Sequence, residues 1–101
     1  MKYSLSAQDF KIVYNNSKKM NTGDILFMHS NTLKNAGVGF LVSKKYGNAV
    51  KRNLFKRRCR SLYIQCDFKN KKTSLIIRPL IQNINYTKLN NHFKELLKIV
   101  T

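Results

Sequence analysis

Seventeen residues in the middle of the chain have the composition of a surface that binds phosphate groups. Positions 44 to 60 read KKYGNAVKRNLFKRRCR, with eight lysines or arginines and no acid. Arginine can hold a phosphate through two parallel hydrogen bonds, and an asparagine set among the cations can pair with a base edge or a sugar hydroxyl. The types and spacing of these residues therefore indicate a surface that binds a nucleic acid.

A helical wheel, drawn at about 100° per residue, sorts this stretch into faces. Four apolar side chains share one narrow sector that should face the core: Phe55, Cys59, Leu62 and Cys66. On the other side, Arg52, Lys56 and Arg60 form one row, and Asn53 and Arg57 form a second row beside it. Like charges at i, i+4 destabilise a helix by a few tenths of a kcal/mol per pair. A helix face that was only solvated would alternate its charges, so we expect this one to bind phosphates.

The elements that position this face can be read from the pattern. Gly47 can adopt the backbone angles of a tight connection, and Asn48 is a good N-cap, so a helix should span residues 48–65 rather than a disordered tail. An earlier helix is expected over residues 6–15, where Ser6 and Asp9 have capping-box spacing. A last amphipathic helix is expected from Asn85 to the end of the sequence.

Short strands are predicted between these helices. Three segments have the length and apolar content of strands: residues 25–29, 38–43 and 73–78. The polar stretch NNSKKMNTGD, residues 15–24, is expected to be a loop. From the residues alone the order is therefore α-β-β-α-β-α.

Composition limits the classes of function. The 101 residues fit one small domain, and 20 basic against 4 acidic residues give a formal charge of +16. Such a chain repels itself unless a polyanion is near, so nucleic acid is the leading partner and an anionic membrane surface the second. No signal peptide or membrane span is apparent, and Cys59 and Cys66 are expected to be buried thiols in a reducing cytosol.

The segment GFLVSKKYGNAVKRNLFKRRCR closely resembles the signature of the protein subunit of bacterial ribonuclease P, roughly V-G-x-x-V-x-K-K-x-G-x-A-V-x-R-N-x-x-K-R-x-x-R. Weaker similarity flanks it in DFKIVY near the start, in IIRP and in the final helix, so the resemblance covers nearly the whole chain. Two positions depart from the family pattern. Leu54 stands where an arginine is common, and Arg58 stands where an apolar residue is common.

The resemblance implies an α+β fold in a single domain, residues 1–101, with the order α-β-β-β-α-β-α. It also implies a sheet packed on helices and a left-handed βαβ crossover, against the usual rule, as in a domain of a ribosomal protein. The function it implies is that of a cytoplasmic ribonucleoprotein endonuclease, a hydrolase that removes the 5′ leader of precursor tRNA in tRNA processing. Its catalyst is the ribonuclease P RNA with bound magnesium, and one protein joins each RNA.

The resemblance also assigns roles to residues, none of them catalytic or metal-binding. Contacts with the catalytic RNA are expected from seven residues: Lys44, Lys45, Arg52, Asn53, Lys56, Arg57 and Arg60. The cleft for the precursor leader is expected to include Phe10, Tyr14 and Met28, since aromatic rings can stack on unpaired bases. Core packing is the simpler alternative for Phe10 and Tyr14.

Other classes of protein fit less well. The few acids are dispersed, and His29 and His92 lie far apart in sequence, so no side-chain triad for a protein enzyme is apparent. A ribosomal or other structural RNA-binding protein shares the size and charge of this chain, and only the long signature separates the two. No helix-turn-helix spacing supports a DNA-binding protein.

Overall fold

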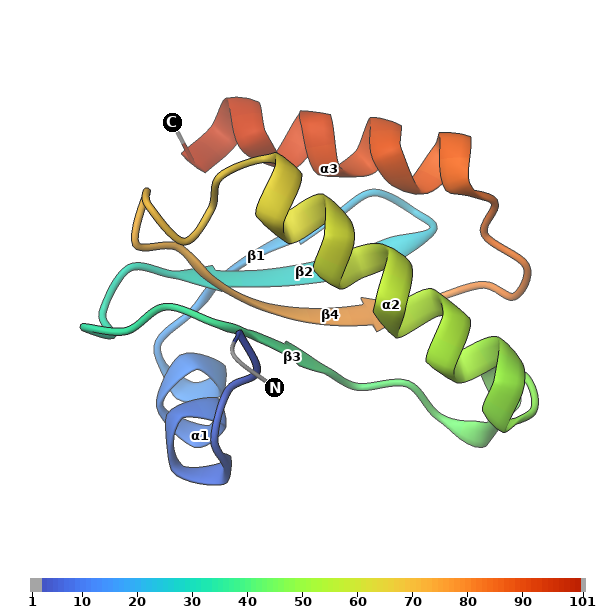
Figure 1. Cartoon of the computed structure of the whole chain (residues 1–101), viewed down its shortest axis with the longest axis horizontal. Coiled ribbons are helices and arrows are strands. Elements are labelled where there is room, and N and C mark those ends of the chain that lie inside the picture. The colour runs from blue at the N-terminus through green and yellow to red at the C-terminus, as the bar shows by residue number, and fades with distance from the viewer. Residues whose placement is uncertain (1–2, 101) are drawn as a thin grey trace.

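Three helices pack against the two faces of a four-stranded sheet (Figure 1). The structure is a computed structural model that describes residues 3–100, so residues 1, 2 and 101 of the expected domain 1–101 lie outside the described part. Along the chain the elements are α1 Ala7–Asn15, β1 Lys18–Asn21, β2 Ile25–Ser30, β3 Val38–Phe40, a 3-10 turn at Lys44–Tyr46, α2 Ala49–Gln65, β4 Ser74–Pro79 and α3 Tyr86–Val100. This α-β-β-β-α-β-α order confirms the fold class implied by the resemblance.

The sheet is mixed, with strand order β1-β2-β4-β3. β1 pairs with β2 and β2 with β4 in antiparallel fashion, whereas β3 and β4 are parallel. In Figure 1 both parallel strands run from left to right, with β4 above β3 and α2 in front of the sheet, so the β3-α2-β4 crossover is left-handed. This is the exceptional hand that the resemblance implied.

The main core lies between the sheet and the pair α2 and α3. Alternate strand residues point to this side, among them Phe27 of β2 and Ile77 of β4. They meet Leu62 of α2 and Phe93 of α3, all of them fully buried. The Phe93 ring contacts the Phe27 ring edge to face, with centroids 5.3 Å apart. This layer fixes α2 against the sheet.

A smaller core lies on the opposite face of the sheet, beneath α1. Val13 of α1 is fully buried there against Met28 of β2 and Ile76 of β4. The helix begins as the sequence predicted, because the Ser6 hydroxyl accepts a hydrogen bond from the Asp9 backbone N–H at 3.1 Å. The sheet therefore separates α1 from α2 and α3.

Two predictions about strands were wrong. The stretch 15–24 contains β1, whose side chains are mostly exposed and which is held by backbone pairing with β2, so its apolar pattern is weak. Gly23, with φ +93°, makes the turn into β2. The strand expected over 38–43 ends at Phe40, because the chain then turns into the 3-10 segment that leads to α2.

Candidate nucleic-acid interface

The start of α2 is built as the sequence predicted. The Asn48 side-chain oxygen accepts a hydrogen bond from the Lys51 backbone N–H at 2.9 Å, which caps the helix. Gly47 has φ +154°, and a Cβ there would lie 2.9 Å from Cδ of Lys51. Lys44 and Lys45 are exposed in the 3-10 turn just before this cap. The connection therefore presents both lysines beside the first turn of α2.

The row Arg52, Lys56 and Arg60 does not lie on the far side of α2, as the helical wheel suggested. All three side chains are half-buried, and the Arg60 guanidinium carbon lies 5.3 Å from the ring centre of Phe40 on β3. The wheel was wrong because the buried sector is wider than four residues, and it includes Tyr63 on the same side as this row. Of the five polar side chains that the wheel placed together, Asn53 and Arg57 are the two that are exposed.

Two guanidinium groups in this row lack part of their hydrogen bonding. The Nε atoms of Arg52 and Arg60 are buried, and neither has a hydrogen-bond partner within the described chain. A buried donor without an acceptor costs about 1–3 kcal/mol or more when it is charged. An acceptor supplied from outside, such as a phosphate oxygen, would remove that cost. The α2 flank facing β3, which comprises Arg52, Lys56 and Arg60, is therefore suited to bind an anion.

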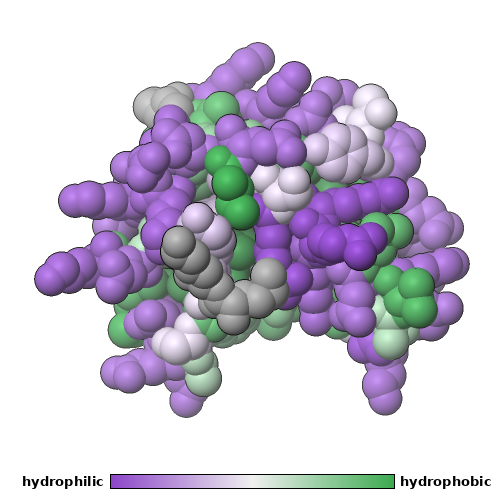
Figure 2. Space-filling view, viewed as in Figure 1, coloured by the Kyte–Doolittle hydropathy of each residue, from purple (hydrophilic) through white to green (hydrophobic). Residues whose placement is uncertain are grey.

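The positive charge is not neutralised internally. Among residues 3–100, the contacts between a basic side chain and a carboxylate are those of His92 with Asp24 at 2.9 Å and with Glu95 at 3.9 Å. No described lysine or arginine thus lies within ion-pair distance of a carboxylate. Figure 2 shows hydrophilic side chains over most of the face that carries α2 and α3. A polyanion is the partner that such a surface fits.

The residues expected in the leader cleft lie on the other face of the sheet. Phe10 and Tyr14 of α1 stack with ring centroids 6.4 Å apart, and Tyr14 is 51% exposed. Phe10 is half-buried in the cluster beneath α1, so it has both a packing role and accessible surface. Met28 is 3% exposed and packs under α1, which leaves it almost no surface for a ligand. Its place in a cleft stays a prediction that this burial does not favour.

β3 lies between the two sets of residues and contacts one residue of each. Its successive residues point to opposite faces, so Phe40 meets Arg60 of α2 while Gly39 faces Phe10 of α1. A Cβ on Gly39 would lie 2.7 Å from the Phe10 ring, so the glycine lets that ring rest on the strand. Among the residues that the structure describes, the N-terminal segment pairs with β3 at Val38, through the bridge from Ser4. β3 therefore has Arg60 on one face and Phe10 on the other.

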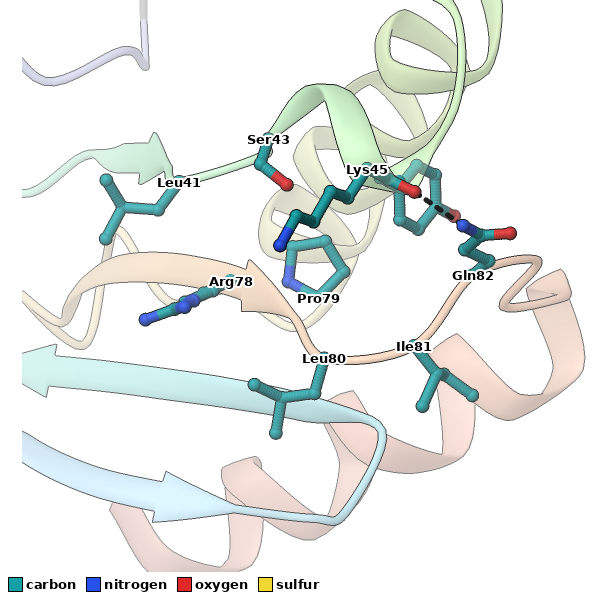
Figure 3. Close-up of a pocket in the computed structure, with 9 residues that line it drawn as sticks. Leu41, Ser43, Lys45, Arg78, Pro79, Leu80, Ile81 and Gln82 are labelled. Carbon is teal, nitrogen blue, oxygen red and sulfur yellow. Dashed lines mark hydrogen bonds between the residues drawn. The ribbon is translucent and has the colours of Figure 1, made fainter.

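A pocket of about 270 Å³ lies where β3 and β4 end (Figure 3). Lys45 and Arg78 both line it, and the Lys45 side chain extends across Pro79. The Gln82 side-chain amide donates to the Lys45 carbonyl at 2.6 Å, which ties the 3-10 turn to the segment after β4. Arg78 was not singled out from the sequence. In the sequence it stands directly after the apolar residues 75–77 and before the single proline, and in the structure it is an exposed residue of β4.

The remaining candidate groups are metal-ligand side chains and the two cysteines. Within the described residues, no three histidines, cysteines or acids gather in a way that could hold a metal ion. Cys59 is buried and Cys66 half-buried, and neither forms a disulfide. Burial raises the pKa of both thiols, which keeps them protonated and unreactive. No helix among residues 3–100 is long and apolar enough to cross a membrane.

Comparison of the sequence with protein families matches residues 4–101 to the family described as Ribonuclease P. A ribonuclease P protein component from Streptococcus agalactiae is 31% identical over 93% of this chain and 89% of its own length. One from Helicobacter acinonychis is 41% identical over 65% of this chain but only 44% of its own length, so the chain spans less than half of that relative.

Solved structures agree in fold. The RNase P protein of Staphylococcus aureus superimposes with a TM-score of 0.77 at 21% identity, over 100% of this chain and 96% of that one. The RNase P protein from Thermotoga maritima gives a TM-score of 0.76 at 18% identity, over 97% of each chain. At these identities the match describes the arrangement of helices and strands rather than the function.

Proposed function

Because the chain belongs to the ribonuclease P family and is thus the protein part of a tRNA-processing enzyme, we propose that it binds the ribonuclease P RNA and the 5′ leader of precursor tRNA. In this role it assists the endonucleolytic removal of that leader. The single observation that carries the proposal is the α2 flank facing β3, where half-buried arginines hold donors without acceptors. The alternative of a ribosomal or other structural RNA-binding protein is not favoured by the family match.

The proposed contact with the catalytic RNA runs along α2 and the turn before it. The half-buried row of Arg52, Lys56 and Arg60 would hold backbone phosphates against β3, since arginine can bind phosphate bidentately. The exposed Asn53 and Arg57 would extend the contact on the outer side of the helix. Lys44 and Lys45 would add charge at its N-terminal end.

The proposed leader cleft lies at the face of the sheet that carries α1. Tyr14 offers the larger accessible ring, and Phe10 supports it from a half-buried position on Gly39. Unpaired bases stack on such rings, so a single-stranded leader is the part of the precursor that fits. Met28 would act from beneath, by supporting α1 rather than by touching a base.

We further propose that bond cleavage belongs to the RNA. The RNA would carry most of the magnesium, which activates water and stabilises charge in such reactions. The protein side chains named above would bind and orient the two RNA strands, with one protein for each RNA. We take residues 1–101 as one domain, a view supported by the continuous main core that joins the sheet to α2 and α3. Its proposed place of action is the cytoplasm.

A cleavage assay tests the proposal directly. Purified protein, a bacterial ribonuclease P RNA and precursor tRNA are mixed at a magnesium concentration too low for the RNA to act efficiently alone. We expect 5′ cleavage well above that of RNA alone, because the cationic side chains of the protein reduce the repulsion between the two RNAs. No gain in cleavage, with the protein folded by circular dichroism, would contradict the proposed function.

The leader cleft makes a separate prediction. The double variant Phe10→Ala and Tyr14→Ala should lose about 5- to 150-fold in affinity for precursor tRNA and little for mature tRNA, since a lost base stack costs about 1–3 kcal/mol. Binding of the two tRNAs to the assembled protein–RNA complex measures this ratio. Tyr86→Ala, which removes a 40% exposed ring on α3, is the control. An unchanged ratio would assign Phe10 and Tyr14 to packing alone.

A further inference from the structure

A second pocket lies on the other flank of α2, away from β3. It is bordered by α2, the 3-10 turn and the segment between β4 and α3, and its volume is about 200 Å³. Its lining residues come from all three segments: Tyr46, Lys51, Leu54, Phe55, Arg58, Asn83 and Ile84. Pockets for drug-sized ligands are larger, about 300–1,000 Å³. This pocket is therefore suited to one small planar group.

The floor of the pocket is apolar and aromatic. Phe55 and Ile84 are buried and Leu54 is half-buried. The Tyr46 ring lies 5.1 Å from the Phe55 ring, centroid to centroid, and tilts by 51°. Burial raises the pKa of the Tyr46 hydroxyl, so the ring remains neutral. Such a floor favours the flat face of a ring over a charged group.

The rim of the pocket is cationic and lacks acids. Lys51 and Arg58 line it, while the four acids of the chain, Asp9, Asp24, Asp67 and Glu95, do not. Neither cation takes part in an ion pair within the described residues. Asn83 adds an exposed amide, which can both donate and accept, on backbone with φ +57°. A ligand with a polar-edged ring and a nearby negative charge would use all of these groups.

We propose that this pocket binds one unstacked nucleotide of an RNA strand. Its base would lie against Leu54 and Tyr46 with its edge toward the Asn83 amide, and its phosphate would contact Lys51 and Arg58. Leu54 and Arg58, the two positions that depart from the family pattern, thereby share one site. The inference rests on the proposed function in taking RNA as the partner, and it gives α2 nucleic-acid contacts on both flanks.

Nuclear magnetic resonance on the isotope-labelled protein tests the site with small probes. Adenosine 5′-monophosphate and inorganic phosphate are titrated separately at equal concentration. We expect the nucleotide to shift the methyl signals of Leu54 and Ile84, because ring currents act only on adjacent groups, and inorganic phosphate to leave them unchanged. Equal effects of the two probes, or nucleotide shifts confined to the flank with Arg52, Lys56 and Arg60, would overturn the proposal.

Variants separate the pocket from general charge. The double variant Lys51→Ala and Arg58→Ala should weaken nucleotide binding about tenfold, and Asn83→Gly, which tolerates the positive φ, should weaken it severalfold. The matched control, Lys94→Ala with Lys98→Ala, removes the same charge from exposed positions on α3 and should change affinity less than twofold. Equal losses of nucleotide affinity in the pocket variant and in the control would refute a specific nucleotide site at this pocket. The cleavage assay is independent of these titrations, so either proposal can fail alone.

Discussion

Replacing Arg52, Lys56 and Arg60 together by alanine should weaken binding to ribonuclease P RNA on the order of 100- to 1000-fold near physiological salt. Each hydrogen bond from a charged donor contributes about 1.5–3 kcal/mol, and part of this is screened by salt. The three residues share the α2 flank facing β3, where two of them hold a buried Nε atom without a partner. Filter binding or fluorescence anisotropy over a range of salt concentrations measures the loss.

The salt dependence of this variant is the sharper readout. The slope of log affinity against log salt should become shallower by about 2 to 3, because each phosphate contact contributes about 0.7–0.9. The control variant, Lys88→Ala with Lys94→Ala and Lys98→Ala, removes the same charge from exposed positions on α3. A slope that changes equally in both variants would mean that α2 acts only through net charge.

Replacing Phe93 by alanine should lower the free energy of unfolding by about 3–5 kcal/mol, the usual cost of removing a buried phenylalanine. The Phe93 side chain is fully buried, and its ring meets Phe27 at 5.3 Å and Phe68 at 6.2 Å between centroids. Few neighbours could move to fill the cavity, because they belong to the sheet and to the segment after α2. Urea unfolding, monitored by circular dichroism, gives the change.

The same helix supplies the control for this prediction. Ile99 is 58% exposed on α3, so Ile99→Ala should change the free energy of unfolding by less than about 0.5 kcal/mol. If Phe93→Ala lowers the free energy of unfolding by less than about 1 kcal/mol, α3 does not pack on the main core as described. Since α2 packs on that core, the Phe93 variant should also lose RNA affinity at temperatures where it begins to unfold.

Local signals predicted the helices closely. The caps at Ser6 and Asn48 form the hydrogen bonds expected of them, and α2 ends at Gln65 as predicted. Such signals act over three or four residues, so they can be read without knowledge of the rest of the fold. β1 carried no such signal, because an exposed edge strand is held by backbone pairing with β2 rather than by its own apolar side chains.

The candidate site was only partly predictable. The sequence showed which residues carry positive charge and that acids are absent among them. It did not show that Arg60 would lie over Phe40, or that Lys45 and Arg78 would line one pocket. In each of these pairs the two residues lie on different elements, and neither one specifies the position of the other.

The sequence by itself determined the identities of the helices, the charge of +16 and its concentration between residues 44 and 60, because these depend on residue type and short-range spacing. The tertiary structure alone decided how that charge is arranged. The left-handed crossover places α2 on one face of the sheet, while α1 packs on the other. Tertiary packing half-buries the row Arg52, Lys56 and Arg60, and it sets Arg60 over Phe40 of β3. The physical reason is that burial depends on which surfaces pack together, and residues distant in sequence provide those surfaces.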